Sequence, residues 1–192
     1  MIVDLISRVR RNHALEHATI HVLSRKLHNF SVQGNAAPNG FYLNVFGKLS
    51  IDAIEDAAED ALRRMKGGEH QLAIHPNCGT VLLTSAVMAT ITGQLIVAAE
   101  QRRLGSGRLS WWDYLNILPT AVLGVVIALI VSRPVGMYMQ TFTTDGRPRD
   151  LHIVGVHKRP LSPIARFFRL LLGQNSRPDA QSYFIETTTG EF

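Results

Sequence analysis

The residues best suited to chemistry lie near the N-terminus, in the string RNHALEHATIH. His13 and His17 are four residues apart, so on a helix their rings lie one above the other and reach one metal ion. Glu16, three residues from His13, lies on the same side. In this H-x-x-E-H order the two histidines ligate zinc and the glutamate acts as a general base on the bound water. His21 lies about 80° from His13 around the helix, and its role stays open.

The helical wheel of residues 1–28 constrains how these polar groups are satisfied. His13, Glu16 and His17 fall on the face that also carries the apolar residues Ile2, Leu5, Ile6, Val9, Ile20, Leu23 and Leu27. A carboxylate on an apolar face is costly unless it is paired, hydrogen-bonded or near a cation. A metal ion or a protonated histidine would supply that compensation. The alternative is a structural helix in which Glu16 pairs with His13 or with a cation brought in by the fold.

A second cluster, GEHQLAIHPNCGT, lies directly before a long apolar stretch. Cys78 as a thiolate and His75 as an imidazole are both good zinc ligands. A tetrahedral site can combine His13 and His17 with Cys78 or His75 and leave one position for water, which is the open geometry of a catalytic zinc site. Taken alone, a single cysteine is more often a small buried residue than a ligand.

Two apolar stretches predict a transmembrane hairpin. Pro76 to Ala99 runs 24 residues without a charge, and Tyr114 to Ser132 runs 19. A membrane span needs about 20 predominantly apolar residues. Trp111 and Trp112 precede the second stretch, where an aromatic belt would lie. The alternative is a pair of buried helices in a soluble core, which rarely run so long without a charge.

The remaining sequence predicts a small mixed α/β water-facing domain built from both termini, so the fold class is an α+β membrane protein with a two-helix transmembrane hairpin. Its expected parts are residues 1–75 with the H-x-x-E-H motif, the hairpin at 76–133, and a β-rich portion at 134–192 that contains an amphipathic helix. The expected elements are a helix over 1–28, two strands within 30–47, a helix from Ser50 to Lys66, strands at Gln71–Ile74, Met137–Thr143, Leu151–His157 and Ser182–Glu186, and a helix at Ser162–Leu172.

Charge favours a lipid partner over a nucleic acid. The net charge of +5 suits contact with anionic lipid headgroups. The basic residues are scattered and no base-stacking motif accompanies them, so nucleic-acid binding is not expected. The basic residues that flank the two apolar stretches are nearly balanced, four against three: Arg63, Arg64, Lys66 and Arg133 against Arg102, Arg103 and Arg108. The single cysteine favours a reducing compartment, and the main domain is expected in the cytoplasm.

The two motifs together resemble a known group of proteins. H-A-L-E-H-A-T-I, followed some sixty residues later by H-P-N-C-G-T, is similar to uncharacterised bacterial membrane proteins with H-x-x-E-H-x-T-I and H-P-x-C-G-T patterns, classed as domains of unknown function and in part labelled predicted metal-dependent enzymes. The matching positions are His13, Glu16, His17, Thr19, Ile20, His75, Pro76, Cys78, Gly79 and Thr80. The resemblance covers residues 10–100. H-x-x-E-H also resembles the inverted-zincin peptidases, which use a further downstream glutamate; Glu69 is the nearby candidate, in a different context.

The expected function is a zinc-dependent hydrolase, with a peptidase as the favoured class, anchored in the bacterial cell membrane. Its expected partners are the lipid bilayer and a membrane-protein or peptide substrate. Another class is a non-catalytic membrane subunit or assembly factor, in which His13, His17, His75 and Cys78 form a closed structural clasp. A third is a peripheral lipid- or ligand-binding module, which would hold no metal.

Overall fold

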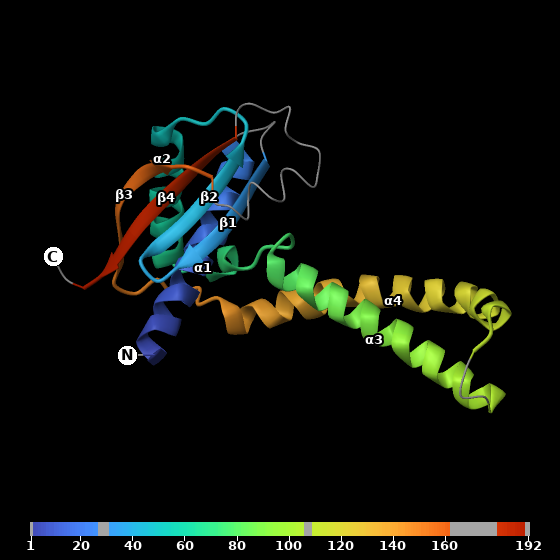
Figure 1. Cartoon of the computed structure of the whole chain (residues 1–192). Coiled ribbons are helices and arrows are strands. Elements are labelled where there is room, and N and C mark those ends of the chain that lie inside the picture. Colours follow the sequence, from blue (N-terminus) through green and yellow to red (C-terminus); the bar gives the residue numbers. More distant parts are fainter. Residues whose placement is uncertain (1, 27–30, 106–108, 162–179, 191–192) are drawn as a thin grey trace. The chain divides into compact units, whose positions relative to one another are not determined.

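The computed structural model describes residues 2–26, 31–105, 109–161 and 180–190. Within these ranges the chain forms four α-helices, a short 3-10 helix and a four-stranded antiparallel sheet, so the predicted α+β class is confirmed (Figure 1). The chain divides into two compact units. The first comprises Met1–His75 and Thr143–Phe192, and the second comprises Pro76–Phe142. We refer to them as the sheet unit and the hairpin unit.

The sheet unit is assembled from both ends of the chain. Strands β1 (Ser31–Ala37) and β2 (Gly40–Phe46) form a hairpin, and β4 (Ala180–Thr189) lies between β2 and β3 (Leu151–Arg159). All neighbours are antiparallel. Strand β4 therefore joins the β1–β2 hairpin to β3, and without β4 these strands would not form one continuous sheet. The strands expected within 30–47 and at Leu151–His157 and Ser182–Glu186 are confirmed.

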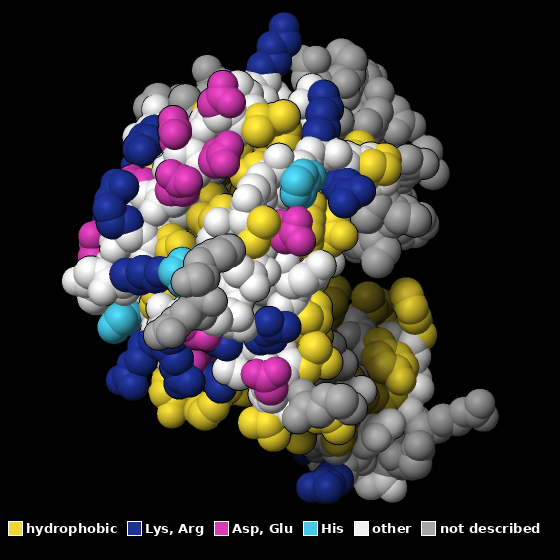
Figure 2. All heavy atoms as spheres, turned by 90° about the vertical axis from the view of Figure 1, so that its left-hand side faces the viewer, with side chains coloured by type: hydrophobic (Ala, Val, Ile, Leu, Met, Phe, Trp, Pro, Cys, Tyr) yellow, Lys and Arg dark blue, Asp and Glu magenta, His cyan; other side chains and the backbone are white. Residues whose placement is uncertain are grey.

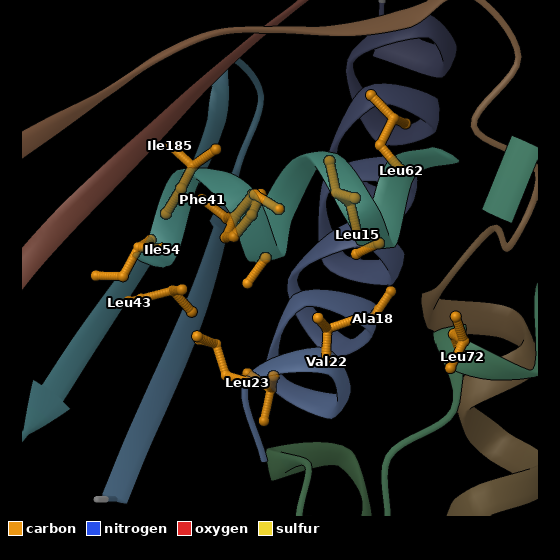
Figure 3. Close-up of a cluster of buried hydrophobic side chains, with 14 of the residues drawn as sticks. Leu15, Ala18, Val22, Leu23, Phe41, Leu43, Ile54, Leu62, Leu72 and Ile185 are labelled. Atoms are coloured by element: carbon orange, nitrogen blue, oxygen red, sulfur yellow. The ribbon is translucent and has the colours of Figure 1, made fainter. Parts of the chain in front are cut away.

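Two helices cover one face of this sheet (Figure 1). Helix α1 (Ile2–Lys26) packs on β1 and β2, and α2 (Ile51–Lys66) packs on β3 and β4. Figure 3 shows apolar side chains from both helices and the strands meeting in one cluster, which includes Leu15, Val22, Leu23, Phe41, Leu43, Ile54 and Ile185. Burial of the middle turns of α1 in this core holds the H-x-x-E-H segment in place.

Helix α2 begins as the sequence predicts. The hydroxyl of Ser50 accepts the backbone N–H of Ala53 at 3.1 Å, which satisfies one of the unpaired donors at the N-terminus of the helix. The helix ends at Gly67, and the 3-10 helix η1 (His70–Ala73) follows. The strand expected at Gln71–Ile74 is therefore wrong. These four residues form local backbone hydrogen bonds in a single 3-10 turn, so they do not pair with a strand of the sheet.

Asn12 fastens α1 to the sheet beside His13. Its side chain is fully buried; Nδ2–H donates to the carbonyl of Ala37 at 2.8 Å, and Oδ1 accepts the Thr187 hydroxyl at 2.7 Å. Replacing Asn12 with alanine would leave both partners buried without this bond, so we expect the free energy of unfolding to fall by about 1–3 kcal/mol. Chemical unfolding of the detergent-solubilised protein would measure the loss. The control is Ser24→Ala, at an exposed position of the same helix. If Asn12→Ala lowers the free energy of unfolding no more than Ser24→Ala does, the prediction is contradicted.

The apolar residues in the first turns of α1 are exposed. Ile2, Val3 and Ile6 are 70%, 81% and 53% exposed, whereas the helix is buried almost continuously from Arg11 to Leu23. Helical period alone shows which residues share a face. It does not show how far the sheet and α2 extend beneath that face, and here they do not extend to the first turns.

The hairpin unit consists of α3 (Gly79–Leu104) and α4 (Trp111–Thr143). Both helices are long and apolar enough to cross a membrane. Within the described residues, only 6% of the most apolar part of α3 and 17% of that of α4 is buried. The core helix of a soluble protein would be mostly buried, and these two helices are not.

Small residues allow α3 and α4 to approach each other closely. A Cβ on Gly136 would lie 2.7 Å from the Cα of Val81, which is closer than real side chains pack. The hydroxyls of Ser85 and Ser132 hydrogen-bond across the helices at 2.6 Å. Close backbone contact at small residues and hydroxyl hydrogen bonds are typical of helix pairs in membranes, where apolar burial between helices contributes little.

The strand expected at Met137–Thr143 is wrong, because these residues form the last two turns of α4. Their composition is typical of a strand, but they extend an existing long helix, and adding residues to a helix is far easier than starting a new element. Tyr138 and Phe142, four apart, make an edge-to-face contact with ring centroids 5.6 Å apart, which only the helix permits. The amphipathic helix expected at Ser162–Leu172 lies outside the described residues.

The face shown in Figure 2 carries acidic and basic side chains intermingled. Within the sheet unit, Lys26 pairs with Asp60 at 3.4 Å, and such solvent-accessible pairs contribute little to stability. Arg11 pairs with Asp150 at 2.6 Å, but only 6% of the Arg11 side chain is exposed. Intermingled charges are the surface expected of a unit that faces water.

Candidate metal centre

Three histidines follow one another along α1 at intervals of one turn: His13, His17 and His21. His17 is 2% exposed and the other two are half-buried. The ring centroids of His13 and His17 are 4.5 Å apart, and a ring nitrogen of one lies within 4.8 Å of a ring nitrogen of the other. The structure therefore brings together the two histidines of the H-x-x-E-H motif, at a separation that one metal ion can bridge with bonds of about 2.0–2.1 Å after a small adjustment.

His75 joins this row from the connector that follows η1. Its ring centroid lies 5.8 Å from that of His17 and 4.8 Å from that of His21. It therefore lies beside the C-terminal half of the row, next to His17 and His21. It does not belong to the compact group of ligand atoms that contains His13 and His17. A ring rotation or a short shift of the connector would be needed for His75 to reach an ion held by both.

Hydrogen bonds determine which ring nitrogens of His13 and His17 carry protons. His13 Nδ1–H donates to the carbonyl of Thr143 at 3.2 Å, and His17 Nδ1–H donates to the carbonyl of Ala73 at 2.6 Å. A carbonyl oxygen only accepts, so Nδ1 is protonated in both rings, and in the neutral ring Nε2 keeps its lone pair. Histidines that bind metals nearly always donate their other N–H to a carbonyl or carboxylate in this way.

Burial keeps two of these rings neutral. It lowers the pKa of His13, an effect that the hydrogen bond to Thr143 partly offsets. Burial, and secondarily the charge of nearby His21, lowers the pKa of His75 from 6.5 to about 4. Near neutral pH both rings are unprotonated. A metal ion can therefore bind without displacing a proton from either ring.

We expect the metal-free sheet unit to lose stability as pH falls from about 6.5 to 4. The His75 ring takes up a proton near pH 6.5 when the chain is unfolded but only near 4 when it is folded. The unfolded state binds more protons in this window, so stability is complete above it and declines with acid. Unfolding temperatures measured from pH 7 to pH 4 would show the decline. His75→Gln should flatten it, and an unchanged slope in that variant would contradict the assignment.

Glu16 lies in a space that depends on one glycine of β1. Its side chain is 4% exposed, and a Cβ on Gly34 would lie 1.8 Å from Glu16 Oε1 and 2.2 Å from Cδ. The carboxyl group is thus packed directly over the backbone of Gly34. The sequence analysis did not single out Gly34. An isolated glycine within a strand pattern was the available signal, since such glycines often mark a close approach by another group.

Cys78 belongs to the hairpin unit. It is the N-cap residue of α3, and its Sγ accepts the backbone N–H of Thr80 at 3.5 Å. A helix N-terminus favours negative charge, and therefore the thiolate that zinc binding requires. Chain connectivity alone keeps the Cα of Cys78 within about 11 Å of that of His75, since consecutive Cα atoms are about 3.8 Å apart.

Glu69, the downstream glutamate suggested by the inverted-zincin resemblance, is engaged elsewhere. Its carboxylate receives two hydrogen bonds from the Arg64 guanidinium, with Nε to Oε1 at 2.8 Å and Nη2 to Oε2 at 2.5 Å. His70, its neighbour, donates Nδ1–H to the carbonyl of Gly146 at 2.8 Å and is exposed. Both residues lie at the start of η1 and are not part of the row of histidines on α1.

The sequence matches a family described as a domain of unknown function (DUF6391) over residues 8–156, which contain every histidine of the row and both sequence motifs. The chain belongs to the DUF6391 family. The predicted resemblance to an uncharacterised family is confirmed. The chain is also 35% identical over 153 residues to an uncharacterized protein of Picosynechococcus sp. (strain PCC 7002), a match that covers 74% of this chain and 68% of that protein. No solved structure matches the chain.

Proposed function

We propose that this DUF6391 protein is a membrane-anchored, zinc-dependent hydrolase, with a peptidase as the favoured class. The observation that carries the proposal is the paired arrangement of His13 and His17. The two rings are one turn apart, and both donate Nδ1–H to a backbone carbonyl, so Nε2 is the nitrogen through which each could bind a metal ion. Two imidazoles oriented by backbone acceptors are a common starting point for a zinc site.

The other roles follow from the chemistry of the neighbouring residues. His75 or Cys78 would complete the ligand set and leave one position for water. Bound zinc would supply Lewis acidity and make that water acidic near neutral pH. Glu16 would accept the proton of the attacking water and return it to the leaving amine, which completes peptide hydrolysis. A buried carboxyl group against Gly34 has few accessible orientations, and this suits a base that must stay aimed.

We place the hairpin unit in the bilayer as two transmembrane helices. The length, apolar composition and low burial of α3 and α4 support this placement. Trp111 and Trp112, 71% and 72% exposed at the start of α4, suit the membrane interface. The expected location is the bacterial cell membrane, with the sheet unit on the cytoplasmic side. A site beside the membrane surface suits a membrane-protein or peptide substrate.

A second candidate function, a non-catalytic membrane subunit or assembly factor, has its own supporting observation. His17 and His21 bind the carbonyls of Ala73 and Ile74 before the hairpin unit, and His13 binds that of Thr143 after it. The histidines of α1 thus already hold both chain connections to the hairpin. A metal ion with four ligands, His13, His17, His75 and Cys78, would strengthen this clasp and leave no position for water.

The two functions differ in what Glu16 contributes. We expect the zinc-loaded protein in nanodiscs to cleave members of a fluorogenic peptide library. Glu16→Gln should lower kcat by about 100-fold or more, since a positioned general base contributes about 10²–10⁴-fold, and should leave the zinc content unchanged. Bound zinc without any cleavage would exclude the peptidase and support the clasp. Cleavage at an equal rate by Glu16→Gln would remove Glu16 from the mechanism.

A further inference from the structure

The first turns of α1 form an apolar surface that the described residues of the sheet unit leave uncovered. Ile2, Val3, Leu5 and Ile6 are 70%, 81%, 48% and 53% exposed. At 100° per residue these four side chains span about 160° of the helix circumference, so they form one broad apolar stripe. Such a stripe on a helix end requires a partner or an apolar environment.

Helix α1 is attached to both chain segments that connect to the hairpin unit. Before α3, the carbonyls of Ala73 and Ile74 accept hydrogen bonds from His17 and His21 at 2.6 Å and 2.9 Å. At the end of α4, the carbonyl of Thr143 accepts a bond from His13 at 3.2 Å. Helix α1 therefore contacts Ala73 and Ile74, shortly before α3 begins, and also Thr143, the last residue of α4.

Arg10 strengthens the second attachment and brings it closer to the apolar stripe. Its Nη2 donates to the carbonyl of Thr144 at 3.0 Å, and its own carbonyl accepts the backbone N–H of Asp145 at 3.0 Å. Ile6 and Ile2 precede Arg10 by four and eight residues. Along the helix axis they lie about 6 and 12 Å from this attachment, at 1.5 Å per residue.

We propose that the first turns of α1 lie in the headgroup and upper acyl-chain region of the bilayer, with Ile2, Val3, Leu5 and Ile6 in contact with lipid. The inference rests on the proposed membrane placement of the hairpin. If α3 and α4 span the bilayer, the segment before Gly79 and the residue Thr143 reach the same membrane surface. Because α1 is hydrogen-bonded to the chain near both points, its apolar first turns are within reach of that surface.

The charges around the stripe fit this environment. Arg8 and Arg10 follow the apolar residues within two turns, and their hydrogen bonds go to the uncharged partners Thr189 and Thr144. Asp4 is the one acid among residues 2–10. Basic residues beside an apolar helical stripe are typical of helices that lie in the interface of anionic membranes. The metal-binding pair His13 and His17 would then lie two to three turns from inserted side chains, which would keep the candidate site beside the bilayer.

Tryptophan quenching by brominated lipids tests the inference on the full-length protein. Val3→Trp is made in a background of Trp111→Phe and Trp112→Phe, so that one tryptophan reports its depth and the metal ligands are untouched. The matched control is Ile51→Trp in the same background. Ile51 is likewise an exposed apolar residue in the first turn of its helix, 40% exposed, but lies about 22 Å along α2 from the end that leads to η1. Both are reconstituted in vesicles whose lipids carry bromine at defined chain positions.

We expect the Val3→Trp variant to lose emission in these vesicles, most strongly with bromine nearest the headgroup, and the Ile51→Trp control to keep its emission. Adding Leu5→Asn and Ile6→Asn to Val3→Trp should restore emission. Equal emission in Val3→Trp and the control would overturn the inference, as would strongest quenching by bromine at the chain ends. Equal emission is the result expected if a protein partner or a second copy of the chain covers the stripe in place of lipid.

The unsubstituted protein separates failure of this inference from failure of the membrane proposal. Its native Trp111 and Trp112 begin α4, so lipid-borne bromine should quench them if the hairpin spans the bilayer. Quenching of the native pair with no quenching of Val3→Trp would overturn the inference alone. If the native pair also keeps its emission, the membrane placement falls, and the inference falls with it.

Discussion

Replacing His17 with alanine is expected to abolish stoichiometric zinc binding by the purified protein. His17 is almost fully buried, and its Nδ1–H is held by the Ala73 carbonyl at 2.6 Å. Its ring centroid lies 4.5 Å from that of His13 and 5.8 Å from that of His75. Loss of a hydrogen-bonded neighbour of a ligand typically weakens metal affinity by about 10–100-fold, so loss of a ligand should exceed roughly 100-fold. Elemental analysis and competition with a chromogenic chelator would measure content and affinity.

The matched control is His70→Ala. His70 is also a histidine of the sheet unit with Nδ1–H on a backbone carbonyl, that of Gly146, but it lies outside the row on α1. We expect its zinc content to equal that of the unsubstituted protein. If His17→Ala also keeps that content, or if the unsubstituted protein binds no zinc, the metal centre is disproved, and with it both the hydrolase and the clasp.

The same measurement identifies the remaining ligand. His75→Ala and Cys78→Ser each remove one of the two alternatives. Loss of zinc in only one variant assigns three protein ligands and an open position, as in a catalytic site. Loss in both assigns a closed site with four ligands and favours the structural clasp.

Replacing Gly34 with alanine is expected to lower the free energy of unfolding by about 1–3 kcal/mol, the usual cost of inserting atoms into a filled space. The added Cβ would overlap Glu16, whose Oε1, Cδ and Cγ lie 1.8, 2.2 and 2.5 Å from its position. Glu16 is buried, so its carboxyl group has little room to withdraw. Hydrolysis, if present, should fall as well, because the carboxylate would leave its position while the histidines keep theirs.

A double-mutant cycle separates this contact from a general intolerance of the strand. In a Glu16→Ala background the overlap is gone, and Gly34→Ala should then be neutral or stabilising by about 0.4–1 kcal/mol, because alanine restricts the unfolded chain. Gly155→Ala is the control for a strand glycine, since its Cβ would meet nothing closer than 3.8 Å. If Gly34→Ala costs no more than Gly155→Ala, or costs the same in both backgrounds, Glu16 is not held by Gly34.

Local signals in the sequence predicted most elements correctly. The cluster of Gly, Asn and Pro residues within 30–47 predicts a turn between two strands, and Ser50 with Gly67 bounds α2, because turn and capping chemistry involves only neighbouring residues. The errors occurred where a longer range decided the outcome. Residues 137–143 extend α4 although their composition predicted a strand, and residues 71–74, also predicted as a strand, lie at a 3-10 helix. The helical spacing of Ile2 and Ile6 does not reveal that both are exposed.

For the candidate site, the sequence by itself determined which chemical groups are available: two imidazoles and a carboxyl group whose spacing places them on neighbouring positions of one helix. The position of His75 beside His17 depended on tertiary packing, because 58 residues separate the two along the chain. So did the carbonyls of Ala73 and Thr143, which select the ring nitrogens that stay unprotonated, and the space over Gly34 that holds Glu16. Helical spacing is a property of consecutive residues, whereas a hydrogen-bond acceptor or an empty space is supplied by whichever distant segment packs there, and only the folded chain determines that segment.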